Sequence, residues 1–339
     1  MGSAASSNAD LDAVLARFRI EPTAIATVAA GRYNTHWRVT TPGGDYALRR
    51  YNQARLASSI PYEHAMLEHV AARGWPVAAP VKSRDGATVV ESEGRCYALF
   101  PWLPGQPGPA HSTAHLRVKG RLLARLHRDM ASFGAGEQRA GFGRVWELDL
   151  PLQSSRFTTF NEMLREFGRE HARLASGIRA QRYRSLRELT RSSYGDLADV
   201  EIHGDFQRDN LLFDRGELTG VLDFDNAHRD ARVVDLAWSI ISDCAEPPAE
   251  TAIDPRLAAA LVGGYAAHTP LSDAELRLIV PLLRAHNVAM CAWSVRRYLE
   301  SGDADTLRRL DRRVSVRLPQ LEARAAAIEE AIASTHGSA

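Results

Sequence analysis

Residues 203–225 are the most informative segment of this 339-residue chain, and they read HGDFQRDNLLFDRGELTGVLDFD. Short apolar runs on either side of a turn at 214–216 predict a small β-hairpin. Polar side chains stand on the connections that flank it, at Asp205, Asn210 and Asp223. Carboxylate and amide oxygens suit Mg²⁺, a hard cation that proteins hold through one or two carboxylates together with substrate phosphates. The segment therefore predicts a magnesium-dependent site for phosphate chemistry.

The same order of groups occurs in protein kinases, in which H-R-D-x-x-x-x-N precedes a hairpin and D-F-G. In the residues of this motif, the chain resembles the aminoglycoside phosphotransferase family. The motif of that family is H-G-D-x-x-x-x-N followed by I-D-F or I-D-W. The resemblance spans roughly Ala24 to Arg297, and homoserine-kinase-type members of the family look most similar. Besides the hairpin, the segments that carry it are Gly31–Thr35, Ala47–Tyr51, Glu63, Trp102–Gly105, Asp235–Ala237 and Asn287–Tyr298.

The resemblance implies a role for each residue of the motif. Asp205 would accept or orient the proton of an acceptor hydroxyl, while Asn210 and Asp223 would hold Mg²⁺ against the phosphates of ATP. Arg49 stands where kinases carry a strand lysine, and Glu63 on the next predicted helix is its expected partner. Neighbouring Arg50 is a competing candidate. Because alternate strand residues face opposite ways, only one of the two arginines can reach the nucleotide, and we favour Arg49.

Weaker nucleotide contacts are expected from the loop at 29–35 and from the segment after residue 99. Asn34 and Thr35 follow a single glycine, where kinases have a glycine-rich loop, and would contact phosphate. Phe100 and Trp102 would offer a carbonyl and an amide to the edge of adenine, since the proline between them has no N–H. Alternatively, the Trp102 ring simply packs between the lobes.

Two aspartates near the motif have open roles. Asp225 is either a second metal contact or a structural hydrogen-bond acceptor. Asp235, at the start of a predicted helix, is either its N-terminal cap or a brace for the catalytic loop, and for this residue we favour a structural role.

The acceptor is expected to meet the C-terminal helices. His286, Met290, Trp293 and Arg297 fall on one face of a helix predicted over 272–300, and this face would line a pocket for a small molecule that bears a carboxylate. A partly buried core helix with polar ends fits the same pattern. The candidate acceptor contacts are Asp209, Asp225, His286, Trp293 and Arg297, with Asp209, Asp243 and Glu246 as alternative sites for an amine.

The chain is predicted to adopt a two-lobe, protein-kinase-like α+β fold that binds Mg-ATP between its lobes. The expected parts are an N-terminal extension (1–20), a nucleotide-binding N-lobe (21–100), a hinge rich in Pro and Gly (101–109), a C-lobe (110–334) and a tail (335–339). The C-lobe would carry the catalytic hairpin and the acceptor site. Periodicity predicts, among others, helices over 61–73, 115–130, 157–174, 234–244 and 305–334.

Composition narrows the class of protein. With 45% hydrophobic and 24% charged residues, the chain can build a core, which argues against disorder. A formal net charge of +1 gives no reason to expect a nucleic-acid partner. The three cysteines lie far apart, no run of about 18 apolar residues predicts a membrane span, and the polar N-terminus has no signal-like segment. We therefore expect a cytoplasmic enzyme.

The predicted function is ATP- and Mg²⁺-dependent transfer of a phosphoryl group to a hydroxyl of a small molecule, either a homoserine-like amino alcohol or a hydroxyl-bearing antibiotic. A Ser/Thr protein kinase is an alternative, although only Phe224–Val234 separates Asp223 from Asp235, which leaves little room for an activation segment. A nucleotide-binding pseudokinase is another, because the strand lysine and the glycine-rich loop are missing. Mg²⁺-dependent turnover of ATP, with and without Asp205, distinguishes this last possibility.

Overall fold

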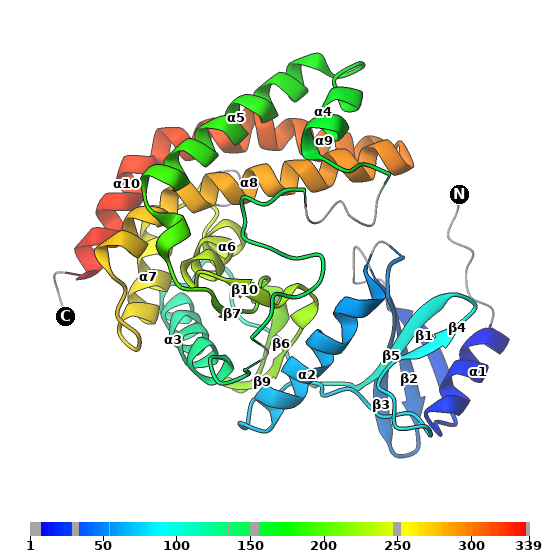
Figure 1. Ribbon diagram of the computed structural model, residues 1–339. Helices are drawn as coiled ribbons and strands as arrows, with labels where there is room; N and C mark the ends of the chain where they lie inside the picture. Colours follow the sequence, from blue (N-terminus) through cyan, green and yellow to red (C-terminus); the bar gives the residue numbers. More distant parts are fainter. Residues whose placement is uncertain are drawn as a thin grey trace. The chain divides into compact units, whose positions relative to one another are not determined.

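The computed structural model describes residues 8–28, 34–53, 55–134, 136–149, 156–246 and 252–336. The chain divides into two compact units, Met1–Gln106 with Leu211–Asp225 (unit 1) and Pro107–Asn210 with Asn226–Ala339 (unit 2). Strands dominate the first unit and helices the second (Figure 1), in line with the predicted α+β class. The hairpin after residue 210 groups with unit 1, although the sequence had placed it in the C-terminal lobe. The predicted domain boundaries themselves stay predictions.

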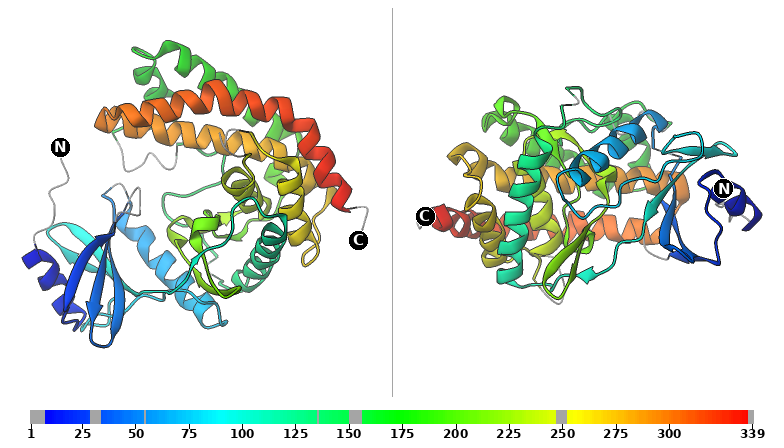
Figure 2. Two further views of the ribbon diagram at one scale, coloured as in Figure 1. Left: turned by 180° about the vertical axis from the view of Figure 1, so that it is seen from behind. Right: turned by 90° about the horizontal axis from the view of Figure 1, so that it is seen from below.

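Unit 1 is built on an antiparallel sheet (Figure 2). The sheet has five strands in the order β1-β2-β3-β5-β4. The predicted hairpin is present, because Thr41 pairs with Gly44 across the turn at Pro42-Gly43. The strands are β1 (Ala24–Val28), β2 (Thr35–Thr41), β3 (Gly44–Arg50), β4 (Val90–Ser92) and β5 (Arg95–Pro101).

Two helices complete the N-terminal part of unit 1. Helix α1 (Asn8–Arg17) contributes Leu11, Val14 and Leu15 to a core that also contains Trp37 and Leu48 of the sheet. Helix α2 (Ile60–Ala71) follows a short 3-10 turn, η1 (Ala57–Ser59), and has a proline in its first turn, where a missing N–H costs no hydrogen bond. It also buries Glu63, a charged residue that must therefore be paired.

The motif hairpin consists of β8 (Leu211–Asp214) and β9 (Glu217–Val221), with short β6 (Gln106–Pro107) completing the order β6-β8-β9. Two hydrogen bonds tie it to the rest of unit 1: Val221 N donates to Pro76 O (2.8 Å) and Thr219 Oγ1 to Pro104 O (2.7 Å). These bonds explain why the hairpin groups with the N-terminal strands. A 3-10 turn, η5 (Phe224–Asn226), follows it.

Unit 2 is helical, with one two-stranded sheet formed by β7 (Val200–Ile202) and β10 (His228–Asp230). Its helices are α3 (Thr113–Met130), α4 (Phe160–Phe167), α5 (Ala172–Arg191), α6 (Val233–Asp243), α7 (Pro255–Ala266), α8 (Asp273–Ser301), α9 (Ala304–Arg312) and α10 (Leu318–His336). Short turns η3 (Tyr194–Asp196) and η4 (Arg208–Asn210) precede β7 and β8. The long helices α8 and α10 lie side by side in both views (Figures 1 and 2).

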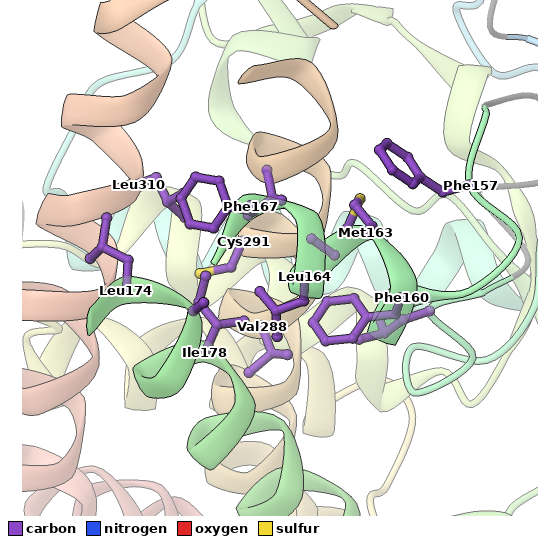
Figure 3. Close-up of a cluster of buried hydrophobic side chains, with 14 residues drawn as sticks. Phe157, Phe160, Met163, Leu164, Phe167, Leu174, Ile178, Val288, Cys291 and Leu310 are labelled. Carbon is purple, nitrogen blue, oxygen red and sulfur yellow. The ribbon is translucent and has the colours of Figure 1, made fainter. Parts of the chain in front are cut away.

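A buried apolar cluster holds α4, α5 and α9 against α8 (Figure 3). Phe160, Phe167 and Ile178 reach it from one side, and Val288 and Cys291 from α8. The prediction of one helix over 157–174 was wrong, because α4 ends at Phe167, before Gly168. The predicted terminal helix is likewise divided, by a π-helical turn at Arg313–Arg317.

Helix α8 is long and apolar enough to cross a membrane by length and composition alone. However, 78% of its most apolar window is buried within the protein. That degree of burial is typical of a central core helix in a helical domain, and the contacts of α8 with α5, α6 and α10 agree with such a role. All three cysteines are free thiols.

Candidate active site

The loop after β7 has a backbone that requires glycine. Gly204 has φ +75°, and a Cβ atom there would lie 2.2 Å from the backbone oxygen of Asn226. A side chain at this position would therefore be both strained and obstructed. The chain turns sharply at Gly204 and presents the next residue, Asp205, to its neighbours in unit 2.

The Asp205 carboxylate accepts hydrogen bonds at both oxygens. Trp238 Nε1 donates to Oδ1 (2.6 Å), while Asn210 Nδ2 (3.1 Å) and Gln207 Nε2 (3.2 Å) donate to Oδ2. Such bonds favour the charged, acceptor form of a carboxylate. Asp205 and Asn210 were expected from the sequence, whereas Trp238 and Gln207 were not.

Asn210 is oriented by the same loop. Its Nδ2 group donates to the backbone oxygen of Asp205 (2.8 Å) as well as to the carboxylate. The amide nitrogen is the donor end of this side chain, and the amide oxygen is its acceptor end. That oxygen is the atom that a hard cation such as Mg²⁺ would use.

One face of α6 holds the catalytic loop, which is the name used here for residues 203–210. Asp235 accepts hydrogen bonds from His203 N (2.7 Å) and Gly204 N (2.8 Å), and His127 Nε2 lies 2.9 Å from the same carboxylate. Ser239 donates to Phe206 O, and Asp243 accepts from Arg208 N (2.9 Å). Asp235 is therefore a brace for the loop rather than the helix cap, which is Arg232.

At the C-terminal end of α6, Asp243 contacts one of the two lysines in the sequence. Lys119 on α3 is fully buried and forms an ion pair with Asp243. Its ammonium also lies 5.5 Å from the ring centre of Phe206, within range of a cation–π contact. Asp243 is thus already neutralised, which removes it from the alternatives for binding an amine.

Removing the brace is expected to destabilise unit 2. Asp235→Ala deprives two loop amides and His127 of their acceptor, and we expect the free energy of unfolding to fall by about 3 kcal/mol. Urea denaturation measures this. Asp273→Ala, on the exposed first turn of α8, is the matched control and should cost no more than about 0.5 kcal/mol. Equal effects of the two variants would contradict the brace.

The same carboxylate predicts an acid dependence. Burial acts to raise the pKa of Asp235, but the His127 hydrogen bond and the charges of His127 and His203 lower it below the ordinary value of 3.8. A depressed pKa means that its stabilisation is complete above that value and is lost as the pH falls further. Asp235→Ala should weaken this part of the acid dependence.

In unit 1, the expected ion pair between Arg49 and Glu63 is present. Arg49 Nη1 lies 2.7 Å from Glu63 Oε1, and Arg49 Nε donates to His36 Nε2 (3.1 Å). The guanidinium also faces the rings of Phe100 (5.1 Å) and Tyr51 (5.7 Å). Burial is the largest single effect and acts to lower the pKa of Arg49, but the charges of Glu63, Tyr51, Asp223 and Asp225 together outweigh it and raise the pKa.

The neighbouring arginine occupies a different environment. Arg50 stacks over Trp37 (5.4 Å to the ring centre) and donates to Thr35 Oγ1 (3.2 Å). Strand alternation thus separates the two arginines as expected. Thr35 itself lies in β2, and its contact with phosphate stays a prediction.

Asp223 follows β9 in a strained backbone conformation. Its φ is +62°, a left-handed value that few residues other than glycine adopt and that is often found at functional sites. Asp223 Oδ1 lies 3.9 Å from Arg49 Nη2. Burial raises the pKa of the Asp223 carboxyl and Arg49 opposes this; because the side chain is still 42% exposed, solvent moderates the shift.

Asp225 is held by two residues of unit 1. Arg55 Nη2 lies 2.8 Å from Asp225 Oδ2, and Asn34 Nδ2 donates to the same oxygen (3.0 Å). Asn34 Oδ1 also accepts from Asn52 N (3.0 Å). The structural role that we considered for Asp225 therefore fits the structure, and Asn34 serves it rather than pointing freely toward a phosphate. The rest of the expected phosphate loop, residues 29–33, lies outside the described residues.

The expected adenine contact at Trp102 needs correction. Trp102 N donates to Asp45 O of β3 (3.0 Å) because β5 and its pairing extend through Pro101. This amide is therefore used in the sheet, and the Trp102 ring stacks with Arg38 at 4.8 Å. The Phe100 side chain is buried beneath Arg49, and a contact of its carbonyl with adenine stays a prediction.

The candidate acceptor residues are distributed over several environments. His286 is buried with its ring edge-on to Trp238, at an interplanar angle of 85°. Arg297 stacks over Trp293 at 5.5 Å from the ring centre. Asp209 is 63% exposed and pairs with Arg208, and Glu246 pairs with Arg324 (2.7 and 3.0 Å).

Within the ranges that the structure describes, no group of three or more His, Cys, Asp and Glu side chains could hold a metal ion by itself. Mg²⁺ needs few protein ligands when phosphates supply the others, and the assignment of Asn210 and Asp223 to this ion stays a prediction.

A model of the phosphotransferase enzyme family matches residues 24–272. The chain belongs to this family. The phosphotransferase is 30% identical over 275 residues to the homoserine kinase of Granulibacter bethesdensis, covering 80% of this chain and 81% of that protein. It is therefore a small-molecule kinase, as the sequence predicted.

Solved structures confirm the protein-kinase-like fold class. An amicoumacin kinase crystallised with AMP-PNP has a TM-score of 0.66 and 17% identity, with 90% of this chain and 92% of that chain covered. An aminopropanol kinase has a TM-score of 0.65 and 18% identity, with 94% and 98% covered. At these identities the phosphotransferase shares their fold, and nothing about its own substrate follows.

Proposed function

We propose that the protein transfers the γ-phosphoryl group of ATP to the hydroxyl of homoserine or of a closely related amino alcohol. The observation that carries this proposal is the Asp205 carboxylate, which N–H donors of unit 2 hold at both oxygens. A carboxylate fixed in this way is an oriented acceptor for an alcohol proton. The likeness to homoserine kinase over 80% of the chain supports the choice of acceptor.

The proposed reaction balances without a further reactant. The acceptor oxygen attacks the γ-phosphorus, the bond from that phosphorus to the bridging oxygen breaks, and the electron pair leaves with ADP. The hydroxyl proton passes to Asp205. Mg²⁺, when bound, would neutralise phosphate charge, and Asn210 and Asp223 are the residues that we propose hold it.

Arg49 is proposed to serve the nucleotide phosphates. Its pairing with Glu63 and stacking on Phe100 fix the guanidinium, and its planar fork suits phosphate oxygens. This geometry weakens the argument for a pseudokinase, since an arginine takes over the paired position of the strand lysine.

For the acceptor we propose Trp293 and Arg297, with Arg297 facing a carboxylate and exposed Asp209 facing an amine. The His286 side chain is buried, and burial together with the charge of Arg313 holds its pKa well below the usual value. His286 is therefore neutral near pH 7 and cannot supply a positive charge to a carboxylate.

A panel of acceptors tests the proposed function. We expect ADP release with Mg-ATP to be fastest on homoserine, weaker on aminopropanol, and slow on choline, hydroxylysine, an aminoglycoside, a macrolide and a generic protein. Mass spectrometry of the product should show one added phosphoryl group. Phosphorylation of the protein substrate alone would instead indicate a protein kinase, and turnover of none would contradict the proposal.

A further inference from the structure

We propose that Trp238 is a positioning residue for Asp205: its indole N–H fixes the orientation of the carboxylate that receives the acceptor hydroxyl. The inference rests on the proposed function and deepens it. It also makes a separate claim about a hydrogen bond, which can be tested without any substrate.

The argument begins with the freedom of an aspartate side chain. The last torsion of Asp joins an sp³ to an sp² carbon and is broad, so the plane of the carboxylate is set by its surroundings and not by rotamer preference. Asn210 and Gln207 both donate to Oδ2, at 3.1 and 3.2 Å. Donors at a single oxygen leave the carboxylate free to swing about that point.

Trp238 supplies the second point of attachment. Its Nε1 donates to the other oxygen, Oδ1, at 2.6 Å, which is the short distance of a charge-assisted bond. Among these donors, Trp238 is the one that comes from outside the loop. It therefore links the orientation of Asp205 to helix α6 rather than to the loop's own fluctuations.

The indole ring is itself held in place. Trp238 lies on α6 between Asp235 and Ser239, both of which bind the backbone of the catalytic loop. On its other side the ring meets the buried, neutral His286 edge-on. Helix α8 thus contacts the ring that orients Asp205, which gives His286 a place in the site even though it is buried.

Loss of the hydrogen bond from Trp238 should affect the phosphoryl-transfer step in particular. Loss of the N–H should leave Asp205 present but less well aimed, and misaligned reacting groups are slow to react even when binding is intact. The expected signature is a lower kcat with an unchanged KM for ATP, since the described contacts of the indole, with Asp205 and His286, involve no residue that we assign to the nucleotide.

The first test compares Trp238→Phe with Trp146→Phe. Trp146 is also a half-buried indole of unit 2, packed edge-on against Tyr194 (4.8 Å between ring centres). With homoserine as acceptor, Trp238→Phe should lower kcat roughly 10- to 100-fold and change the KM for ATP by less than about twofold. Trp146→Phe should keep the wild-type kcat. Equal kcat values for Trp238→Phe and wild type would overturn the inference.

A second variant separates the N–H from the packing of the ring. Trp238→benzothienylalanine, introduced at this one position, keeps a bicyclic ring against His286 and replaces only the N–H by sulfur. If the N–H positions Asp205, this variant should be as slow as Trp238→Phe. Recovery of wild-type kcat would show that the ring merely fills space and would overturn the proposal, and this holds even if Trp238→Phe folds poorly.

A third measurement uses no acceptor. In a nitrogen-15 correlation spectrum, the indole N–H resonance of Trp238 should lie downfield and move in Asp205→Asn, while that of Trp146 stays in place. An unmoved Trp238 resonance would overturn the hydrogen bond itself. A different result is that the resonance moves but the wild-type protein phosphorylates no acceptor. The hydrogen bond from Trp238 to Asp205 would then be confirmed, while the proposed function and the kinetic role of Trp238 would both be wrong.

Discussion

Asp205→Asn is expected to lower kcat roughly 10²- to 10⁴-fold, the range associated with loss of a general base, while the Kd for ATP changes by less than about twofold. An amide cannot take the hydroxyl proton. The NH₂ group of the new asparagine would also face a hydrogen-bond donor in either orientation. At the position of Oδ1 this donor is Trp238, and at the position of Oδ2 the donors are Asn210 and Gln207. The substitution should therefore slow phosphoryl transfer without weakening the binding of ATP.

The measurement is ADP release with homoserine, together with calorimetric titration of ATP. Asp214→Asn makes the same chemical change at the exposed turn of the β8–β9 hairpin and should leave both quantities at their wild-type values. Wild-type kcat in Asp205→Asn would remove Asp205 from the mechanism. A large loss of ATP affinity would mean that its role lies in binding.

Asp223→Asn is expected to abolish most of the gain in nucleotide affinity that Mg²⁺ provides. The carboxylate is the charged oxygen ligand that we propose for the ion, and its loss should remove the roughly tenfold gain in affinity, about 1.4 kcal/mol. Asparagine is a better probe than alanine, because Asn tolerates the left-handed backbone that Asp223 adopts at φ +62°. A loss of binding in Asp223→Asn therefore reports on the charge and not on backbone strain.

The test compares the Kd for ATP with Mg²⁺ and with a chelator present. In the wild type the two values should differ by about tenfold or more, and in Asp223→Asn they should converge. Asp214→Asn again serves as the control. Should Asp223→Asn retain the full Mg²⁺ effect, the ion must be held by other groups.

Local motifs were the part of the site that sequence could predict. Asp205 and Asn210 are five positions apart and hydrogen bond to each other. The resemblance to kinases implied the Arg49–Glu63 pair, and strand alternation separated Arg49 from Arg50. In the first case a short segment brings the two groups together, and in the second the motif of the family supplies the partner.

Partners that come from distant segments were missed for a physical reason. Trp238 reaches the catalytic loop from helix α6, and His127 reaches Asp235 from helix α3. Arg55 pairs with Asp225, which is far from it in the sequence. Periodicity predicts a helix but not which of its polar or aromatic residues meets a given loop. The one available signal for Trp238 was its position three residues after Asp235, on the same helix face.

The sequence pattern also failed to predict where two elements end. The Trp102 amide was assigned to adenine because the segment was interpreted as a strand-like linker in which Pro101 has no N–H. Instead, β5 includes Pro101 and its pairing with β3 uses the next amide. The helix break at Gly168 was missed because the apolar pattern continues on both sides of it.

The placement of the two lysines makes the protein easy to interrogate with amine-directed reagents. Lys82 is exposed, while Lys119 is enclosed between Asp243 and the Phe206 ring. In the native state a side-chain acylating reagent meets Lys82, and Lys119 reacts only when the packing of α3 against the loop comes apart. The labelling ratio of these two side chains is thus a direct readout of how often that region opens.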